Sequence, residues 1–204
     1  MAGQPAHSSR PGRFVDVLIG STVNYWVAFA FDVLVGVALL VAAARSLPSS
    51  ASLTLSLLVF GILAATLLEY AFHRWVMHGR PSTITRGHLQ HHEEPTALIS
   101  TPLLAVSAIA VTLGVLLSLA VGWTVARTVV AGLYIGYIHF AVVHHLQHRR
   151  NTWLARVGHY RDMERLHHLH HHRRRVNFGI TTSFWDRVFG TFEPTRQLAA
   201  RGYR

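Results

Sequence analysis

Four apolar stretches divide the first two thirds of the chain. They cover residues 25–44, 53–72, 103–123 and 128–143, and the acidic residues Asp32 and Glu69 are the only charged residues inside them. A helix needs about 20 residues to cross about 30 Å of hydrocarbon, so the first three stretches are long enough. The fourth is long enough only if its helix continues into His144. The pattern predicts an all-α integral membrane protein with four transmembrane helices.

Polar segments separate and flank these stretches. Residues 46–52, which include Pro48, and residues 124–127 are short, so stretches one and two, and three and four, are expected to form tight helical hairpins. A secretory signal is a poor interpretation of the first stretch, because 24 mostly polar residues precede it and no clear cleavage site follows. We expect one domain over residues 1–204: a polar tail over 1–24, the membrane region over 25–143, and a cytosolic histidine-rich helical cap over 144–204.

The charge distribution predicts the orientation of these helices. Half of the residues are hydrophobic, the net charge is +10, and all 19 basic residues are arginines. Seventeen of them lie on the side of both termini and two lie in the hairpin turns, so the positive-inside rule predicts cytoplasmic termini. The same asymmetry explains the positive charge without nucleic acid, which we do not expect as a partner. Because cysteine is absent, disulfides, thiolate-ligated haem and cysteine-held iron–sulfur clusters are excluded.

Ten of the sixteen histidines form four short clusters at the predicted cytoplasmic ends of the apolar stretches. Residues three or four apart share a face of a helix, so the last three clusters can each point at one centre. His73 and His78 are five apart, so they either serve different metals or lie where a helix ends, as the following Gly79-Arg80-Pro81 indicates. The clustered residues are His73, His78, His88, His91, His92, His144, His148, His168, His171 and His172.

Ten neutral imidazoles are enough to give five ligands to each of two metal ions, which suits two irons with one open position each. Structural zinc needs four ligands and catalytic zinc usually three, so one zinc ion would leave most of the cluster unused. Copper, nickel and zinc also accept imidazole, and a purified sample can carry zinc in place of iron. We therefore expect two iron ions as the cofactor.

Other polar residues near the clusters are candidates for orienting the ligands. Glu69 lies one helical turn before His73, where it either holds the second N–H of a ligand histidine or pairs with Arg74 at the interface. His145 and His167 are further candidates for this role. His139, His159 and His170 are expected to orient ligands or to lie on helix surfaces, and Asp32 has no assigned role.

These motifs resemble those of the fatty acid hydroxylase superfamily, which contains sterol desaturases and related integral-membrane di-iron enzymes. Residues 69–78 are similar to its first histidine box, 88–92 to the second, 144–148 to the third, and 167–172 to the last, of the form His-His-x-x-His-His. Residues 177–191 resemble its C-terminal signature. The likeness covers roughly residues 60 to 195 and implies four transmembrane helices under a cytosolic cap, with the ten clustered histidines as ligands.

The third box departs from the family pattern. Many relatives carry Tyr-Asp where this chain has Phe140-Ala141, and His139 and His145 add other registers, such as His139-x4-His144. Which of the histidines at 139, 144, 145 and 148 bind metal therefore stays open at this point.

The expected function is that of a membrane-bound non-haem di-iron oxygenase. It would hydroxylate an unactivated C–H bond of a lipid, fatty acyl or related, that arrives from the bilayer, with O2 as co-substrate and electrons from a separate ferredoxin or cytochrome-type reductase. Carotenoid ring hydroxylation and lipid or sterol desaturation are alternatives within the enzymes. A membrane metal transporter or sensor is the alternative outside them, but it would place histidines inside the spans rather than at their ends.

Overall fold

The computed structural model describes residue 17 and residues 20–45, 50–149 and 152–195. These parts contain helices and loops and no strand. The long helices are α2 (Thr22–Ala44), α3 (Ala51–Phe72), α5 (Ala105–Val121) and α6 (Trp123–Gln147). The short elements are η1 (His73–Met77), α4 (Thr83–Glu93), η2 (Trp153–Arg156), α7 (Gly158–His172) and α8 (Phe184–Val188). The prediction of an all-α protein is confirmed for the described residues.

Serine side chains begin three of the helices. Ser21, Ser50 and Ser82 each lie in extended backbone just before α2, α3 and α4, and each hydroxyl accepts from the backbone N–H three residues later. Such caps satisfy amides that have no partner inside the helix. They fix where the first two apolar stretches enter helical structure.

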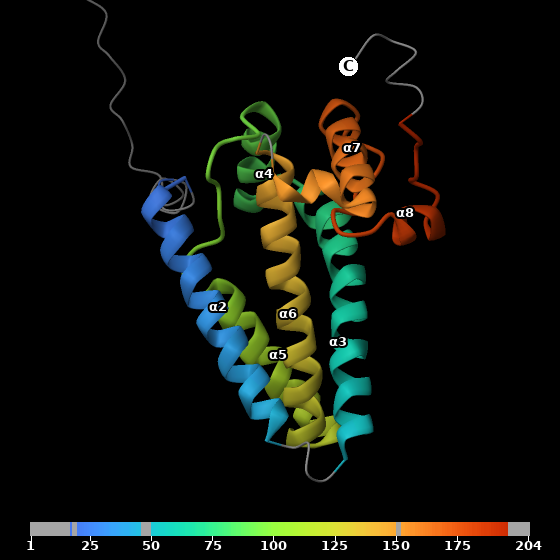
Figure 1. The fold of residues 1–204 in the computed structure, drawn as a ribbon. Coiled ribbons are helices and arrows are strands. Elements are labelled where there is room, and N and C mark those ends of the chain that lie inside the picture. The colour runs from blue at the N-terminus through green and yellow to red at the C-terminus, as the bar shows by residue number, and fades with distance from the viewer. Residues whose placement is uncertain (1–16, 18–19, 46–49, 150–151, 196–204) are drawn as a thin grey trace, which may run out of the picture.

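Helix α6 lies at the centre of the bundle, and α2, α3 and α5 pack against it (Figure 1). Three helices are long and apolar enough to cross a membrane: Thr22–Ala44, Ala51–Met77, which joins α3 to η1, and Trp123–Gln147. Helix α5 has 17 residues and is about 25 Å long, so it is the short member of the set. The fourth predicted stretch does continue past His144, whereas the third is shorter than predicted.

Glycines bring α3 and α6 into backbone contact. A Cβ atom on Gly132 would lie 2.9 Å from the Cα atom of Gly61 and closer still to the carbonyl oxygen of Leu58. A Cβ atom on Gly61 would meet the Gly132 Cα atom at 2.9 Å in return. Small residues at facing positions are the usual means of close helix packing in membranes. This contact sets the distance between the two helices whose upper ends carry histidines.

Asp32 is buried inside the bundle with polar partners. It accepts hydrogen bonds from the hydroxyls of Tyr134 (2.7 Å) and Tyr137 (3.0 Å), and the Tyr134 hydroxyl also contacts Ser107 (2.8 Å). A buried carboxylate costs free energy unless its lone pairs are satisfied, so two hydroxyl donors explain how it is tolerated. This cluster links α2, α5 and α6.

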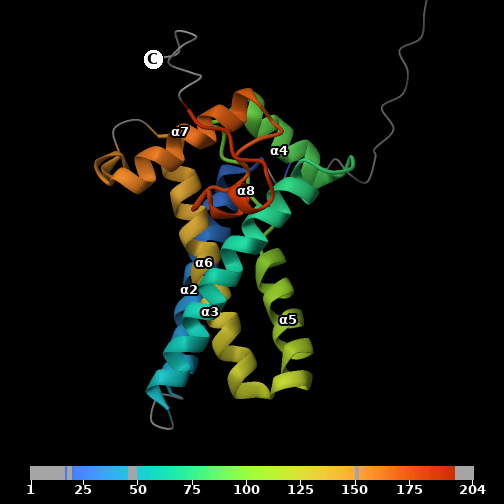
Figure 2. The same cartoon turned by 90° about the vertical axis from the view of Figure 1, so that its right-hand side faces the viewer.

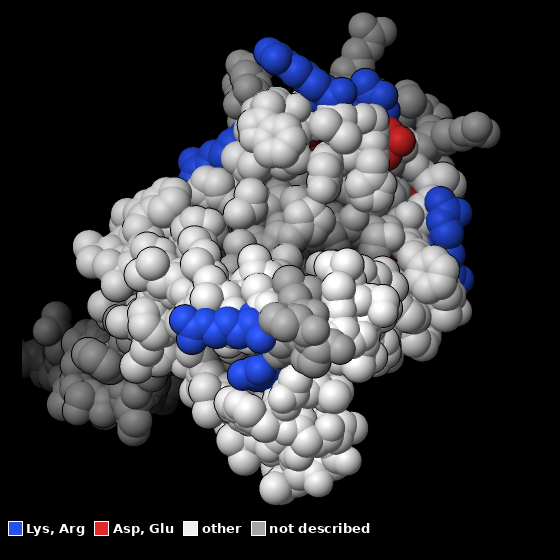
Figure 3. Space-filling model, turned by 60° about the horizontal axis from the view of Figure 1, so that its bottom comes forward, with Lys and Arg blue, Asp and Glu red and all other residues white. Residues whose placement is uncertain are grey.

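The outer surface of the long helices is apolar. Large hydrophobic side chains are widely exposed, among them Leu34 (68%), Phe60 (60%) and Leu119 (80%). Figure 3 turns the lower end of the bundle toward the viewer and shows few charged side chains on it. Exposed apolar surface of this extent is typical of contact with lipid. Together with the length of the helices, it identifies the chain as a membrane protein.

Candidate metal centre

The four histidine clusters meet at one end of the bundle. The end of α3 with η1, the end of α6, and the helices α4 and α7 all lie there, with α8 beside them (Figures 1 and 2). Within this end the histidines separate into two groups whose ring nitrogens lie within 4.8 Å of one another. We call them the first group, which is His73, His78, His88, His92 and His170, and the second group, which is His91, His148, His167 and His171.

Nitrogen atoms of the first group converge on one point. The Nε2 atom of His88 lies 3.0 Å from that of His73, 2.9 Å from that of His78 and 3.1 Å from that of His92. The Nε2 atoms of His78 and His170 are 3.0 Å apart. Donor atoms at right angles on a metal ion with bonds of about 2.1 Å lie about 3 Å apart, so these separations fit one shared ion.

Hydrogen bonding between the rings does not account for this convergence. The Nδ1 atoms of His73 and His170 face the carbonyl oxygens of Phe178 (2.5 Å) and Val176 (2.8 Å), so both Nδ1 atoms carry the proton. The Nε2 atom of each ring is then unprotonated and offers only a lone pair. A single Nε2–H on His88 satisfies only one of its three neighbours, whereas a cation satisfies all of them.

The second group is similar. The Nε2 atom of His167 lies 2.8 Å from that of His148 and 3.1 Å from that of His171. His144 lies beside this group, with its ring centroid 4.7 Å from that of His91 and 4.9 Å from that of His167. The buried Nε2 atom of His91 has no hydrogen-bond partner among the described residues. An orphaned buried nitrogen facing three further imidazoles fits a metal ion.

Element η1 explains how His73 and His78 reach the same group despite their five-residue spacing. It is a π-helical turn in which the His78 N–H donates to the His73 carbonyl oxygen (3.1 Å). The hydrogen bond of this wider turn joins residues five apart, whereas that of an α-helix joins residues four apart. Such turns are frequent at functional sites. The ring centroids of the two residues are 5.2 Å apart. The sequence allowed separate metals or a helix end, and the structure has the helix end.

Helix α7 presents a different set of histidines from the one expected. The structure brings His167, His170 and His171 into the groups and leaves His168 and His172 on the exposed face. The His168 side chain is 51% exposed and lies 3.9 Å from Glu164. The same His-x2-His-His spacing occurs one residue earlier, at 167, 170 and 171. The signal that selects this register is the apolar stripe of Met163 and Leu166, which shares a face with His167 and His170.

The residues predicted to orient ligands have other partners. Glu69 accepts from the backbone N–H groups of Ile180 (2.6 Å) and Thr181 (2.9 Å) and from the Thr181 hydroxyl, and so binds a loop rather than a histidine. His145 contacts the hydroxyl of Tyr25 (2.7 Å) and belongs to neither group. The carbonyl oxygens of Val176 and Phe178 face rings of the first group instead.

Burial keeps these imidazoles neutral. It lowers the pKa of His78 and of His91 to about 4, and the pKa of His92 and of His148 to about 3. Nearby histidines lower the pKa of His92 and His148 further, and Arg174 does so for His78 and His92. Only a neutral imidazole has the lone pair that binds a metal ion. At neutral pH these imidazoles are therefore in the form that can bind a metal ion.

Acidification is expected to release metal and to destabilise the fold together. Below the ordinary histidine pKa of about 6.5, His78 and His92 bind protons in the unfolded chain. In the folded chain they bind protons only at about pH 4 to 3, so acidification favours the unfolded state. Stability is therefore fully present above pH 6.5 and is lost as the pH falls through this window. Metal content and melting temperature measured between pH 7.5 and 4 should fall in parallel. Constant metal content down to pH 4 would contradict the assignment.

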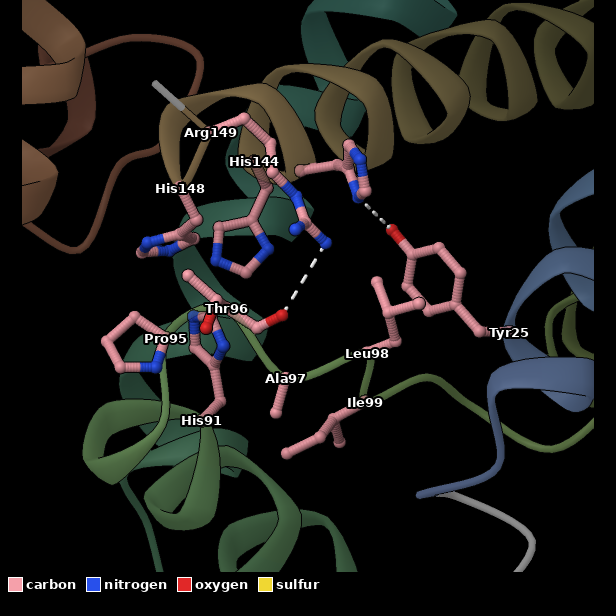
Figure 4. A pocket seen from close by; sticks show the side chains of 11 residues that line it. Tyr25, His91, Pro95, Thr96, Ala97, Leu98, Ile99, His144, His148 and Arg149 are labelled. Atoms are coloured by element: carbon pink, nitrogen blue, oxygen red, sulfur yellow. Dashed lines mark hydrogen bonds between the residues drawn. The ribbon is translucent and has the colours of Figure 1, made fainter.

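A small cavity opens beside the second group (Figure 4). His91, His144 and His148 line one wall, and the loop over 95–99 lines another. Its remaining wall carries polar groups, with Arg149 donating to the Thr96 carbonyl oxygen at 3.5 Å. The cavity thus lies between these histidines and Tyr25, near the start of α2.

Comparisons with known proteins agree with this geometry. Residues 58–191 match the family model described as fatty acid hydroxylase. The chain is 29% identical over 155 residues to the dihydroceramide fatty acyl 2-hydroxylase FAH2 of Arabidopsis thaliana, covering 71% of this chain and 64% of that protein. It is 31% identical over 156 residues to the fatty acid 2-hydroxylase of Rattus norvegicus, covering 70% and 41%. The chain thus spans less than two thirds of the length of these relatives.

A solved structure shares the fold. The visible hydroxylase domain of full-length scs7p superposes with a TM-score of 0.69 at 20% sequence identity, covering 91% of this chain and 72% of that one. At this identity the likeness concerns the fold alone. With the family model matching about two thirds of the sequence and the histidine boxes inside the matched range, the chain belongs to the fatty acid hydroxylase family.

Proposed function

We propose that this chain is a membrane-bound non-haem di-iron oxygenase that hydroxylates carbon 2 of a fatty acyl chain with O2. The observation that carries the proposal is the pair of histidine groups, each with imidazole nitrogens at the spacing of ligands on one ion. The position of hydroxylation is taken from the relatives, which are named as fatty acid or dihydroceramide fatty acyl 2-hydroxylases.

The proposal assigns five histidines to each metal ion. His167 and His170 replace His168 and His172 of the set expected from sequence, and His144 completes the second group. The ligands of the first ion are His73, His78, His88, His92 and His170. The ligands of the second ion are His91, His144, His148, His167 and His171. Bound iron supplies the O2 and one-electron chemistry that amino-acid side chains lack.

The residues of this chain supply position and environment. Burial holds the imidazoles neutral, and the carbonyl oxygens of Val176 and Phe178 fix two rings. The cavity beside His91 and His144 is where the acyl carbon would lie, since His91, His144 and His148 line it. Carbon 2 is bonded to the acyl carbonyl, so the group that binds this carbonyl must lie in the same cavity, where Arg149 is a suitable donor.

The distribution of arginines supports a membrane orientation. We propose that α5 crosses the membrane with α2, α3 and α6, and that the histidine end faces the cytoplasm. Arg45 and Arg127 then lie on the far side, and the seventeen other arginines lie on the cytoplasmic side. A separate ferredoxin or cytochrome-type reductase would deliver electrons to this face.

Lipid analysis of an expressing host tests the proposal. Cells carrying the wild-type chain should gain acyl species with one extra oxygen, whose fragmentation places the hydroxyl on carbon 2. Cells carrying His88→Ala, whose side chain faces three other ligands, should lack them. Lipids that lose two hydrogens would instead indicate desaturation, and an oxidised carotenoid would indicate ring hydroxylation. Product that persists in His88→Ala or without oxygen would overturn the proposal.

A further inference from the structure

The loop between α7 and α8 is held by two carboxylates, the buried Asp186 and the half-buried Glu69. Asp186, which is fully buried in α8, accepts from the backbone N–H groups of Phe178 (2.7 Å) and Gly179 (2.8 Å). Glu69 of α3 accepts from the next two amides, those of Ile180 and Thr181. Four successive backbone N–H groups therefore donate to carboxylate oxygens.

One peptide bond of this loop connects Asp186 to a histidine. The peptide between Phe178 and Gly179 donates its N–H to the Oδ2 atom of Asp186, and its carbonyl oxygen accepts from the Nδ1–H of His73 at 2.5 Å. Hydrogen bonds in a chain polarise one another, so a carboxylate on the N–H side makes the carbonyl a stronger acceptor. A stronger acceptor at Nδ1 raises the basicity of Nε2, the atom that faces His88.

We propose that Asp186 is a positioning residue that strengthens metal binding by the first group through this peptide. The carboxylate polarises the peptide between Phe178 and Gly179, so that the Phe178 carbonyl oxygen binds the His73 Nδ1–H more strongly. No proton is transferred along this path. The inference rests on the proposed function in that it takes the first group to hold a metal ion. It adds the residue that sets the donor strength of this ion's ligands.

A second path from Asp186 leads to His170. The Val176 carbonyl oxygen accepts from the Nδ1–H of His170, and the N–H of the same peptide, that of Asn177, donates to the Thr191 carbonyl oxygen at 2.9 Å. Thr191 is bound to Asp186 twice: its backbone N–H donates to the backbone carbonyl oxygen of Asp186 (2.8 Å), and its hydroxyl donates to the carboxylate (2.7 Å). The Asp186 carboxylate thus binds one of the two peptides that face the first group directly and helps to hold the other through Thr191.

Among the described residues, no carboxylate supports the second group in this way. The buried Nδ1 atoms of His167 and His171 have no hydrogen-bond partner there, as is also true of His92 in the first group. The two ions are therefore expected to differ, with the first held by stronger donors and released more slowly. Glu69 provides a matched comparison, because it binds the same loop through peptides that face no histidine of either group.

Metal release tests this inference. The full chain in detergent is loaded with Co²⁺, whose visible absorption reports its ligands, and an excess of chelator is added. The wild-type protein should release Co²⁺ in a fast and a slow phase. Asp186→Asn keeps the shape of the side chain but removes its charge, and should accelerate the slow phase about 10- to 100-fold and shift its absorption band, leaving the fast phase unchanged. Glu69→Gln should change neither phase more than about threefold.

Two results would overturn the inference: an unchanged slow phase in Asp186→Asn, or equal acceleration in Glu69→Gln, which would mean that only the loop position matters. If Asp186→Asn does not fold, amide hydrogen exchange in the wild-type protein decides. Metal loading should then protect the Gly179 amide more than those of Ile180 and Thr181, and equal protection would overturn the inference. Failure of the wild-type chain to bind metal at all would instead contradict the proposed function.

Discussion

Replacing His170 by alanine is expected to remove one metal ion per chain and to abolish hydroxylation, whereas His168→Ala retains both. His170 contributes an Nε2 atom 3.0 Å from that of His78, and its other nitrogen is fixed by the Val176 carbonyl. Loss of a ligand should weaken binding of the first ion by more than about 100-fold, since even residues that only orient ligands contribute 10- to 100-fold. Metal analysis of purified protein and product formation in cells measure the two effects.

The neighbouring pair gives an independent comparison on the same helix. His167→Ala should remove the second ion, and His172→Ala, on the exposed face, should not. All four variants lose one imidazole from one short helix, so general damage to α7 would affect them alike. Loss of metal in His168→Ala and His172→Ala with retention in the other two would restore the register first expected from sequence.

Gly132→Val is expected to have the largest effect on stability. The added side chain would enter the backbone of α3 at Leu58 and Gly61, where no flexible group can move aside. Overpacking costs about 1 to 3 kcal/mol when side chains can adjust, so this contact between two backbones should cost at least about 3 kcal/mol. Thermal unfolding in detergent should show a large drop in melting temperature or no folded protein.

Gly114→Ala is the control. It adds one carbon atom to a glycine inside an apolar helix, and the new Cβ atom would lie 3.7 Å from a Val130 methyl group, which is ordinary contact. The change should be neutral, or stabilising by up to about 1 kcal/mol from helix propensity. Equal melting temperatures for both variants would mean that α3 and α6 do not pack through Gly132.

Hydrophobic length predicted the long helices because each apolar stretch needs only its own residues to form a helix. Hydrophobic length did not predict which helix is shorter, since the helix of the third stretch begins only at Ala105 and that of the fourth continues to Gln147. Leu104 has a positive φ of 72° just before α5, a backbone state that no apolar pattern signals. Helix ends depend on such local geometry rather than on hydrophobicity.

Eight of the ten histidines expected as ligands lie in or beside the two groups. The two that do not, His168 and His172, result from a shift of one residue on α7, which turns a helix by about 100°. Spacing alone cannot detect this shift, because both registers contain the same motif. The buried face of α7 distinguishes them, and Met163 and Leu166 mark this face in the sequence.

The roles of Glu69 and Asp186 were beyond sequence reasoning for a different reason. Glu69 lies one turn from His73, so a local partner was the natural expectation, but its partners are more than a hundred residues away at Ile180 and Thr181. Asp186 acts across the loop that leads back from α7. Contacts of this kind follow from the path of the chain in space, which a linear pattern does not contain.

The loop that orients His73 also sets when the site can assemble during biosynthesis. His73 is synthesised early and enters the membrane with α3, but its Nδ1 partner, Phe178, follows more than a hundred residues later. Asp186 and Thr191, which hold that loop, are among the last described residues of the chain. A nascent chain with all its apolar helices inserted therefore still lacks the loop that orients His73, so the first group is completed only after residues 178–191 have been synthesised.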